Sequence, residues 1–223
     1  MTAFDRLFVR GRDAVLSGAH VRDVPPVDGG RWGMSVVLVP DRSTRTALAA
    51  ATADALAVAG DDHWPTGTPH AVHVTVRAIE PYRTTPPGDL ADRCARALAR
   101  AAAASGPVGL TFRGLTLTPS GVMACAFPAD GAADHFADRL AHELGPDGWF
   151  EAAFRRDIRY ATLVHFTGDI RDPHALVRFV AERRRRPFGR ATIGAAELLR
   201  FRYDGRQPVR HRLAAADLTS GAG

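Results

Sequence analysis

Hydrophobic and polar positions divide the chain into two kinds of segment. Apolar residues recur at helical spacing in five segments, which predicts five helices. These are residues 4–18, 41–60, 86–105, 130–145 and 172–186. Shorter apolar stretches rich in β-branched residues predict strands between them. These are residues 34–40, 69–81, 108–119, 121–128, 157–170, 190–205 and 207–218.

After the first helix, the predicted elements repeat a similar order. Strand, helix, strand, helix and hairpin are followed by helix, strand, helix and hairpin. This weak internal repeat favours an α+β fold with two similar lobes over a parallel, doubly wound sheet. A Pro/Gly-rich linker at residues 24–31 sets the first helix apart. We therefore expect an accessory helix and linker over residues 1–30 and one bilobal domain over residues 31–223.

Composition adds little about function. The 223 residues are 46% hydrophobic, enough for one substantial core, and carry a formal charge of +5. All 29 basic residues are Arg, a bias that a genome rich in G and C explains, so the basic balance points only weakly to phosphate-bearing ligands. Two scattered cysteines form no disulfide or metal framework. The N-terminal segment carries charges at helical spacing, which predicts a soluble, cytoplasmic protein without a signal peptide or membrane span.

A histidine and a threonine two positions apart draw attention to the strand "PHAVHVTVRAIEP", residues 69–81. Residues i and i+2 of a strand share a face, so His73 and Thr75 lie side by side. The repeat places the strand at 157–170 in the equivalent position of the second lobe. One register sets His73 over Tyr160 and Thr75 over Thr162.

A second register sets the literal motif over "HFT", with His73 over His165 and Thr75 over Thr167. The two registers turn opposite faces inward, because residues 160 and 165 differ in parity. The first register keeps Thr162 early in its strand, as Thr75 is, and is therefore favoured. A β-bulge would still bring His165 to the same pocket.

With these features the chain resembles the two-histidine (2H) phosphoesterase superfamily, in particular its 2′-5′ RNA ligase-like, RNA 2′,3′-cyclic phosphodiesterase branch. The likeness extends over residues 32–218 and rests on the order and spacing of short motifs. These are "MSVVLVP" at 34–40, the Trp64-Pro65 loop before "HVTV" at 73–76, the hairpin at 108–128, "ATL" at 161–163 and "ELLRFRYDGRQPVRHRL" at 197–213.

The resemblance implies a pseudo-twofold, two-lobed fold in which each lobe gives one His-x-Thr strand to a central cleft. It transfers directly to His73, Thr75 and Thr162. The second histidine position holds Tyr160, with His165 as the nearest candidate, so the chain departs from the two-histidine pattern. The substrate implied is a nucleotide or RNA end carrying a cyclic or 2′-5′ phosphate. No metal, cofactor or membrane is expected, and protein partners are left open.

The implied chemistry needs a general base, a general acid and groups that hold phosphate oxygens. Imidazole suits both proton-transfer roles, because its reference pKa of about 6.5 lies near operating pH. A phenol titrates near pH 10 in the reference state, so Tyr160 would be a poor base but could donate a hydrogen bond. Arg77, on the face expected for His73, and Trp64 are candidates for substrate binding. Each of these side chains also has a structural explanation as a strand or core residue.

Two functions remain open besides a metal-independent phosphoesterase. Without a second histidine, the cleft could bind a nucleotide or RNA phosphate without turnover, or serve a small-molecule biosynthetic enzyme. His63, His70 and His73 do not form a metal site at this spacing, since residues three apart on a strand face opposite ways. The run "RRRR" at 183–186 is read as a solvated helix terminus, with RNA contact as the alternative.

Overall fold

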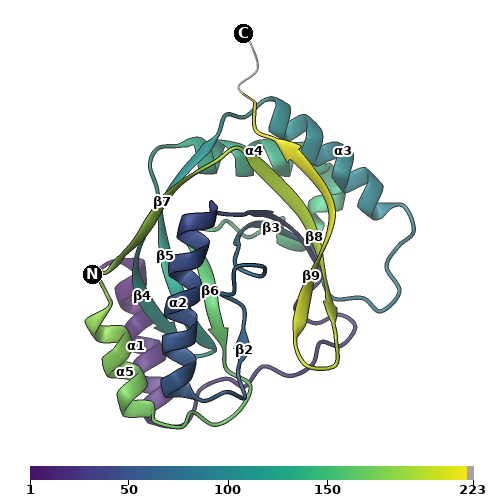
Figure 1. The fold of residues 1–223 in the computed structure, drawn as a ribbon. Helices are drawn as coiled ribbons and strands as arrows, with labels where there is room; N and C mark the ends of the chain where they lie inside the picture. Colours follow the sequence, from purple (N-terminus) through teal and green to yellow (C-terminus); the bar gives the residue numbers. More distant parts are fainter. Residues whose placement is uncertain (220–223) are drawn as a thin grey trace.

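Two antiparallel sheets form the framework of the protein, which is seen in a computed structural model that describes residues 1–219. Sheet A has the strand order β3-β1-β8-β9 and sheet B the order β2-β6-β5-β4-β7. Figure 1 shows the two sheets curving around a common centre. The strands are β1 (Met34–Leu38), β2 (Trp64–Pro65), β3 (Val74–Glu80), β4 (Val108–Thr118), β5 (Gly121–Pro128), β6 (Arg159–His165), β7 (Pro187–Ile193), β8 (Ala195–Tyr203) and β9 (Pro208–Asp217).

Five α-helices cover the sheets, as the periodicity predicts. They are α1 (Ala3–Leu16), α2 (Arg42–Ala59), α3 (Leu90–Ala103), α4 (Ala132–Leu144) and α5 (Pro173–Glu182). Side-chain caps begin two of these helices: the side chain of Asp41 accepts the N–H of Thr44 at the start of α2, and Asp172 accepts the N–H of Ala175 at the start of α5. Helices α1, α2 and α5 contact sheet B, while α3 packs on β8 and β9 with α4 beside it. Figure 1 shows α3 and α4 at the top, α1 and α5 at the left and α2 in front of β5 and β6.

Several predicted boundaries are wrong. The strand predicted over 69–81 begins only at Val74, because Ala71 and Val72 donate their N–H groups to Thr68 O in a preceding turn. The strand predicted over 157–170 ends at His165. The single strand predicted over 190–205 divides at Gly194, where the chain passes from β7 in sheet B to β8 in sheet A. Strand β2 and the 3-10 helix η1 (Gly145–Glu151) were not predicted.

The helix predicted over 172–186 ends at Glu182, and the arginines that follow form packing contacts. The guanidinium of Arg183 lies 4.0 Å from the ring centroid of Phe179. Arg184 pairs with Asp5 of α1 at 2.5 Å and donates to Leu115 O of β4 at 3.1 Å. Through this ion pair and hydrogen bond, Arg184 connects α1 to sheet B.

Helix α1 packs closely on β4. Gly11 is buried, and a Cβ added there would lie 2.5 Å from the carbonyl carbon of Leu117. Only glycine allows this approach of helix and strand without displacement of one of them. Whether residues 1–30 form a unit separate from the rest stays a prediction.

The whole segment between α1 and β1, residues 17–33, contains the predicted linker of residues 24–31 and is called the linker from here on. It crosses from sheet B to sheet A. Val21 and Asp23 donate their N–H groups to Pro119 O and Phe166 O, at the β6 end of sheet B. Further along, Tyr82, just after β3, donates to Gly30 O at 2.8 Å. The linker is therefore bonded to both sheets. Within the described residues, no helix combines the length and the apolar character that a membrane crossing requires.

Candidate functional site

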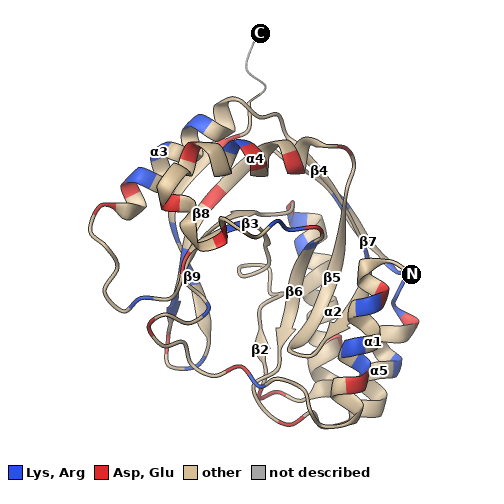
Figure 2. Ribbon diagram, turned by 180° about the vertical axis from the view of Figure 1, so that it is seen from behind, with Lys and Arg blue, Asp and Glu red and all other residues tan. Residues whose placement is uncertain are grey.

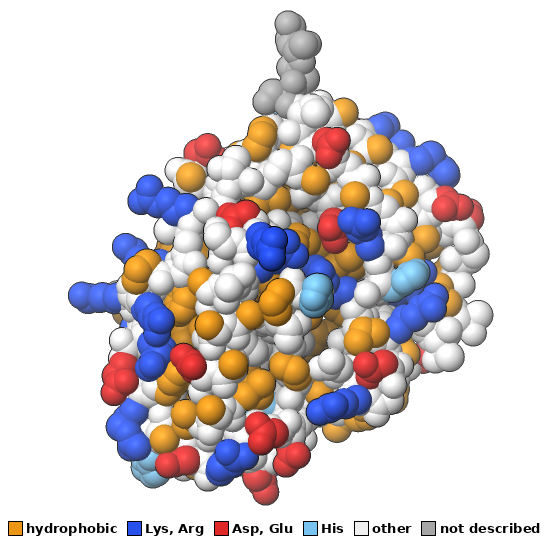
Figure 3. Space-filling view, viewed as in Figure 1, with side chains coloured by type: hydrophobic (Ala, Val, Ile, Leu, Met, Phe, Trp, Pro, Cys, Tyr) orange, Lys and Arg blue, Asp and Glu red, His pale blue; other side chains and the backbone are white. Residues whose placement is uncertain are grey.

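A cleft of about 410 Å³ lies where the two sheets face each other. All five residues that the sequence proposed for catalysis line it: His73, Thr75, Tyr160, Thr162 and His165. His73 immediately precedes β3 and Thr75 lies near its start, in sheet A, while the others come from β6 in sheet B. Figure 3 shows histidine and basic side chains gathered near the middle of the face seen in Figure 1. The volume is in the range of small-ligand sites.

His73 is held by the turn that precedes β3. Its Nδ1 lies 2.8 Å from Ala71 O, and because a carbonyl only accepts, Nδ1 carries the proton and donates it. The neutral ring then has its lone pair on Nε2. Burial, followed by the charges of Arg210, His165 and Arg156, lowers the pKa of His73 to about 4. His73 is therefore a neutral imidazole near pH 7.

A β-bulge in β6 places His165 in the same cleft as Tyr160 and Thr162. Val122 of β5 pairs with Val164, whereas its neighbour Met123 pairs with Thr162, so Leu163 has no partner in the ladder. One extra residue reverses the alternation of faces, and the difference in parity between residues 160 and 165 disappears. The bulge thus brings His165 into the cleft beside the residues of the favoured register, whereas Thr167, which the second register sets over Thr75, does not line it.

His165 is buried, with 4% of its surface exposed, and its Nδ1 lies 2.8 Å from Oδ2 of Asp23. The carboxylate accepts the Nδ1 proton and leaves the Nε2 lone pair free. Burial lowers the pKa of His165, and the hydrogen bond and charge of Asp23 oppose that shift. Trp32 packs edge-on against the imidazole with ring centroids 4.5 Å apart.

Asp23 is the functional candidate that sequence reasoning missed. It lies 142 positions from His165, within residues 1–30, to which the sequence analysis assigned an accessory role. No motif spacing connects the two residues. The only local signal was an acidic residue beside the Pro-rich stretch, which is too common to single out.

Arg156 supplies a positive charge that the sequence did not assign to the cleft. Its Nη2 lies 2.5 Å from Oε1 of Glu151, whose Oε2 accepts the N–H of Ala78 in β3 at 3.0 Å. Both side chains line the cleft and are mostly buried. This ion pair closes the free edge of β3, because Ala78 has no strand neighbour on that side.

The expectation that Arg77 shares a face with Thr75 is wrong. Thr75 pairs with Val37 of β1, and Arg77 pairs with the adjacent Val36, so a bulge at Val76 turns Arg77 to the opposite face. Its Nη2 donates to Gly148 O at 2.8 Å. The residue lines a neighbouring pocket instead of the cleft.

Trp64, the other residue proposed for substrate binding, is buried under the cleft wall. It is 6% exposed and packs against Trp32, with ring centroids 5.9 Å apart. Trp32, Phe150 and Phe201 are the aromatic residues that line the cleft beside the polar groups. Among residues 1–219 no three His, Cys, Asp or Glu side chains come together in a group that could hold a metal ion.

Comparison with known proteins identifies the fold. No family model and no curated protein matches the sequence. Solved structures do match: TT0787 of Thermus thermophilus has 18% identity and a TM-score of 0.63, covering 86% of this chain and 100% of its own. A phosphoesterase has 12% identity and a TM-score of 0.58, over 85% of this chain and 99% of its own.

Escherichia coli LigT solved with 3′-AMP has 10% identity and a TM-score of 0.57, over 85% of this chain and 99% of LigT. LigT was also solved with phosphate, ATP and NADP+. All three proteins have the 2H phosphoesterase fold. The chain therefore has this two-lobed α+β fold, and the fold implied by the sequence resemblance is confirmed.

Proposed function

We propose that the protein is a phosphoesterase that opens a 2′,3′-cyclic phosphate, or cleaves a 2′-5′ linkage, at a nucleotide or RNA end. The observation that carries this proposal is the pair of imidazoles in one cleft, each with Nδ1 bound to an acceptor and Nε2 left free. The crystallisation of LigT with 3′-AMP and phosphate supports a phosphate-bearing nucleotide as the ligand of this fold.

His73 is the general base and His165 the general acid in this proposal. A base must be unprotonated before reaction, which agrees with the lowered pKa of His73. An acid needs a stabilised imidazolium, and Asp23 at 2.8 Å provides a buried negative charge for it. A bound phosphate adds negative charge and favours the protonated form further.

The reaction then needs one water molecule and no covalent intermediate. Nε2 of His73 takes a proton from the water as its oxygen attacks phosphorus. The imidazolium of His165 gives its Nε2 proton to the ribose oxygen that leaves, so one P–O bond forms and one breaks. The hydroxyl groups of Thr75 and Thr162, together with the guanidinium of Arg156, bind the phosphate oxygens on which charge develops. Tyr160 donates a hydrogen bond to the same group.

The test is hydrolysis of adenosine 2′,3′-cyclic phosphate by EDTA-treated protein, with products separated by chromatography. We expect turnover by the wild type and a loss of at least about 100-fold in His73→Ala and in His165→Ala, the range for removal of a general acid or base. His174→Ala, an exposed histidine on α5, is the matched control and keeps wild-type activity. Full activity in His73→Ala contradicts the assignment.

One observation favours a second function, the binding of a nucleotide phosphate without turnover. The pKa values of both cleft histidines are lowered, so neither is held as an imidazolium in the unliganded protein. A cleft with two hydrogen-bond acceptors and no acid would bind a ligand and leave it intact. Recovery of unchanged cyclic phosphate from a tight complex would establish this alternative.

A further inference from the structure

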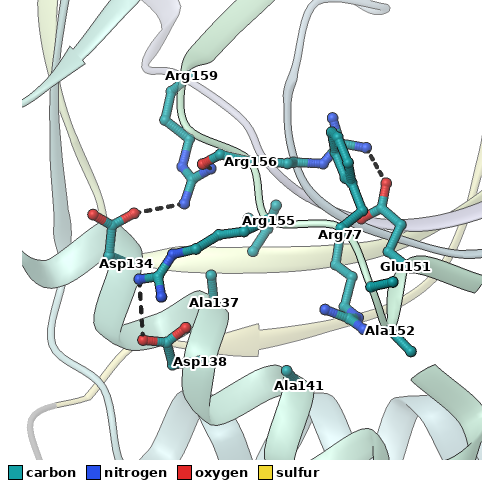
Figure 4. A pocket seen from close by; sticks show the side chains of 13 residues that line it. Arg77, Asp134, Ala137, Asp138, Ala141, Glu151, Ala152, Arg155, Arg156 and Arg159 are labelled. Atoms are coloured by element: carbon teal, nitrogen blue, oxygen red, sulfur yellow. Dashed lines mark hydrogen bonds and ion pairs between the residues drawn. The ribbon is translucent and has the colours of Figure 1, made fainter. Parts of the chain in front are cut away.

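A second pocket, of about 300 Å³, adjoins the cleft on the other side of β3. It shares Glu151 and Arg156 with the cleft, so the two cavities meet at this ion pair. Helix α4 leaves the space open, because it presents the small side chains of Ala137 and Ala141, one turn apart, to the pocket. Figure 4 shows both alanines on α4, below the arginines.

Four arginines line this pocket: Arg77, Arg155, Arg156 and Arg159. Figure 2 shows basic residues where the chain passes between β3 and β6, and Figure 4 shows the side chains themselves. Three carboxylates pair with three of them. Asp134 lies 2.8 Å from Arg159, Asp138 lies 3.5 Å from Arg155 and Glu151 lies 2.5 Å from Arg156.

Of these four arginines, Arg77 alone has no carboxylate partner among residues 1–219, so the pocket carries one excess positive charge. Nε of Arg77 and Nε of Arg156 are both buried and have no hydrogen-bond acceptor in the described chain. A buried donor without a partner is costly, and a charged acceptor compensates that cost. The pocket therefore combines excess positive charge with unused donors from two of its arginines.

We propose that this pocket binds a second phosphate of the substrate, on the 5′ side of the nucleoside whose 2′,3′-cyclic or 3′ phosphate occupies the cleft. The inference rests on the proposed function of the cleft. Two substrates carry such a phosphate: a nucleotide with a 5′-phosphate, and an RNA end, whose last internucleotide phosphate occupies the same position. Arginine suits either, because its planar fork binds phosphate through two parallel hydrogen bonds.

Calorimetric titration with three nucleotides tests the proposal without requiring turnover. The probes are 3′-AMP, adenosine 3′,5′-bisphosphate and the dinucleotide ApAp with a 3′-phosphate. We expect the wild type to bind at least one of the last two about tenfold or more tightly than 3′-AMP. Whichever of these two ligands gains more affinity over 3′-AMP shows whether the second phosphate is a 5′-phosphate or an internucleotide phosphate. Equal affinity for all three overturns the proposal.

Two variants perturb the pocket in different ways. Arg77→Gln removes the unpaired charge, and Ala141→Leu fills the space from α4 while it keeps every arginine. Both are expected to reduce the tenfold preference to about threefold or less. Arg139→Gln, on α4 but not lining the pocket, loses the same charge and keeps the preference. An equal reduction in Arg139→Gln, or no reduction in both pocket variants, overturns the proposal.

Thermal melting and hydrolysis are measured on the same preparations. A melting temperature close to that of the wild type confirms that each variant is folded. If cyclic phosphate is hydrolysed but the second phosphate brings no affinity, the pocket assignment fails and the esterase assignment stands. If the protein binds the nucleotide with the second phosphate more tightly but hydrolyses no cyclic phosphate, the pocket assignment stands and the esterase assignment fails.

Discussion

Replacement of Asp23 by Asn tests the division of roles between the two histidines. The carboxylate lies 2.8 Å from Nδ1 of His165, and both side chains are less than a tenth exposed. A buried hydrogen bond to a charged group contributes about 1.5–3 kcal/mol. Asparagine can still accept the Nδ1 proton but carries no charge, so loss of the carboxylate lowers the pKa of His165 further.

The assay is the pH dependence of kcat/KM for adenosine 2′,3′-cyclic phosphate, which reports the ionisations of the free enzyme. In the proposed mechanism activity requires His165 protonated, so its pKa sets the alkaline limb. Because burial lowers that pKa, the wild-type limb lies below the ordinary histidine pKa of about 6.5. In Asp23→Asn the limb moves to lower pH, and kcat/KM at pH 7 falls about 10-fold to 100-fold, the factor that corresponds to the lost hydrogen bond to a charged group.

The acidic limb serves as an internal reference. It reflects protonation of His73, whose pKa of about 4 depends on the charge of His165 but not directly on Asp23, so it moves less than the alkaline limb. Asp169→Asn is the matched control, since it removes an exposed carboxylate that pairs with Arg22 of the same linker. An unchanged alkaline limb in Asp23→Asn would refute the assignment of His165 as the acid.

Three further predictions concern the phosphate, stability and packing. Thr75→Val and Thr162→Val each lower kcat/KM for the cyclic phosphate about tenfold, mainly through KM in steady-state assays, because one hydroxyl donor is lost; unchanged kinetics would exclude them from binding. The folded state holds the pKa of His73 at about 4, so the unfolded chain takes up a proton first as pH falls from 6.5. Urea unfolding should therefore show a loss of about 2–3 kcal/mol between pH 7 and 4.5 that His73→Gln lacks; parallel curves would contradict this. Gly11→Ala should lower the melting temperature although alanine favours helix by about 1 kcal/mol, because its Cβ would meet the backbone of Leu117; an exposed Asp13→Ala change is the control, and a rise in Gly11→Ala would refute it.

Much of the fold was predictable because periodicity and capping act locally. All five helices appear where apolar spacing placed them, and the Gly121 hairpin joins β4 and β5 as expected. The division of the chain at Gly194 was not predictable, since residues 190–205 alternate like one strand. Whether such a stretch continues in one sheet or passes to another depends on partners that lie far away in the sequence.

The candidate site was predictable in composition but not in geometry. Residue types and the repeat led to His73, Thr75, Tyr160, Thr162 and His165. The assumption that alternate residues of a strand share a face then failed at Leu163 and Val76. Each of these strands contains a bulge there, and no residue type in the sequence predicts it. For the same reason the sequence misassigned Arg77.

In the proposed mechanism, the linker makes the position of Asp23 beside His165 depend on the distance between the two sheets. Its N–H bond from Asp23 to Phe166 O anchors it to sheet B, and its bond from Tyr82 to Gly30 O anchors it to sheet A. A motion that widened the cleft would have to stretch this short connection or release one of its ends. Release at Asp23 would take the carboxylate away from His165, so in the proposed mechanism an opened molecule would lack the charge that stabilises its proton donor.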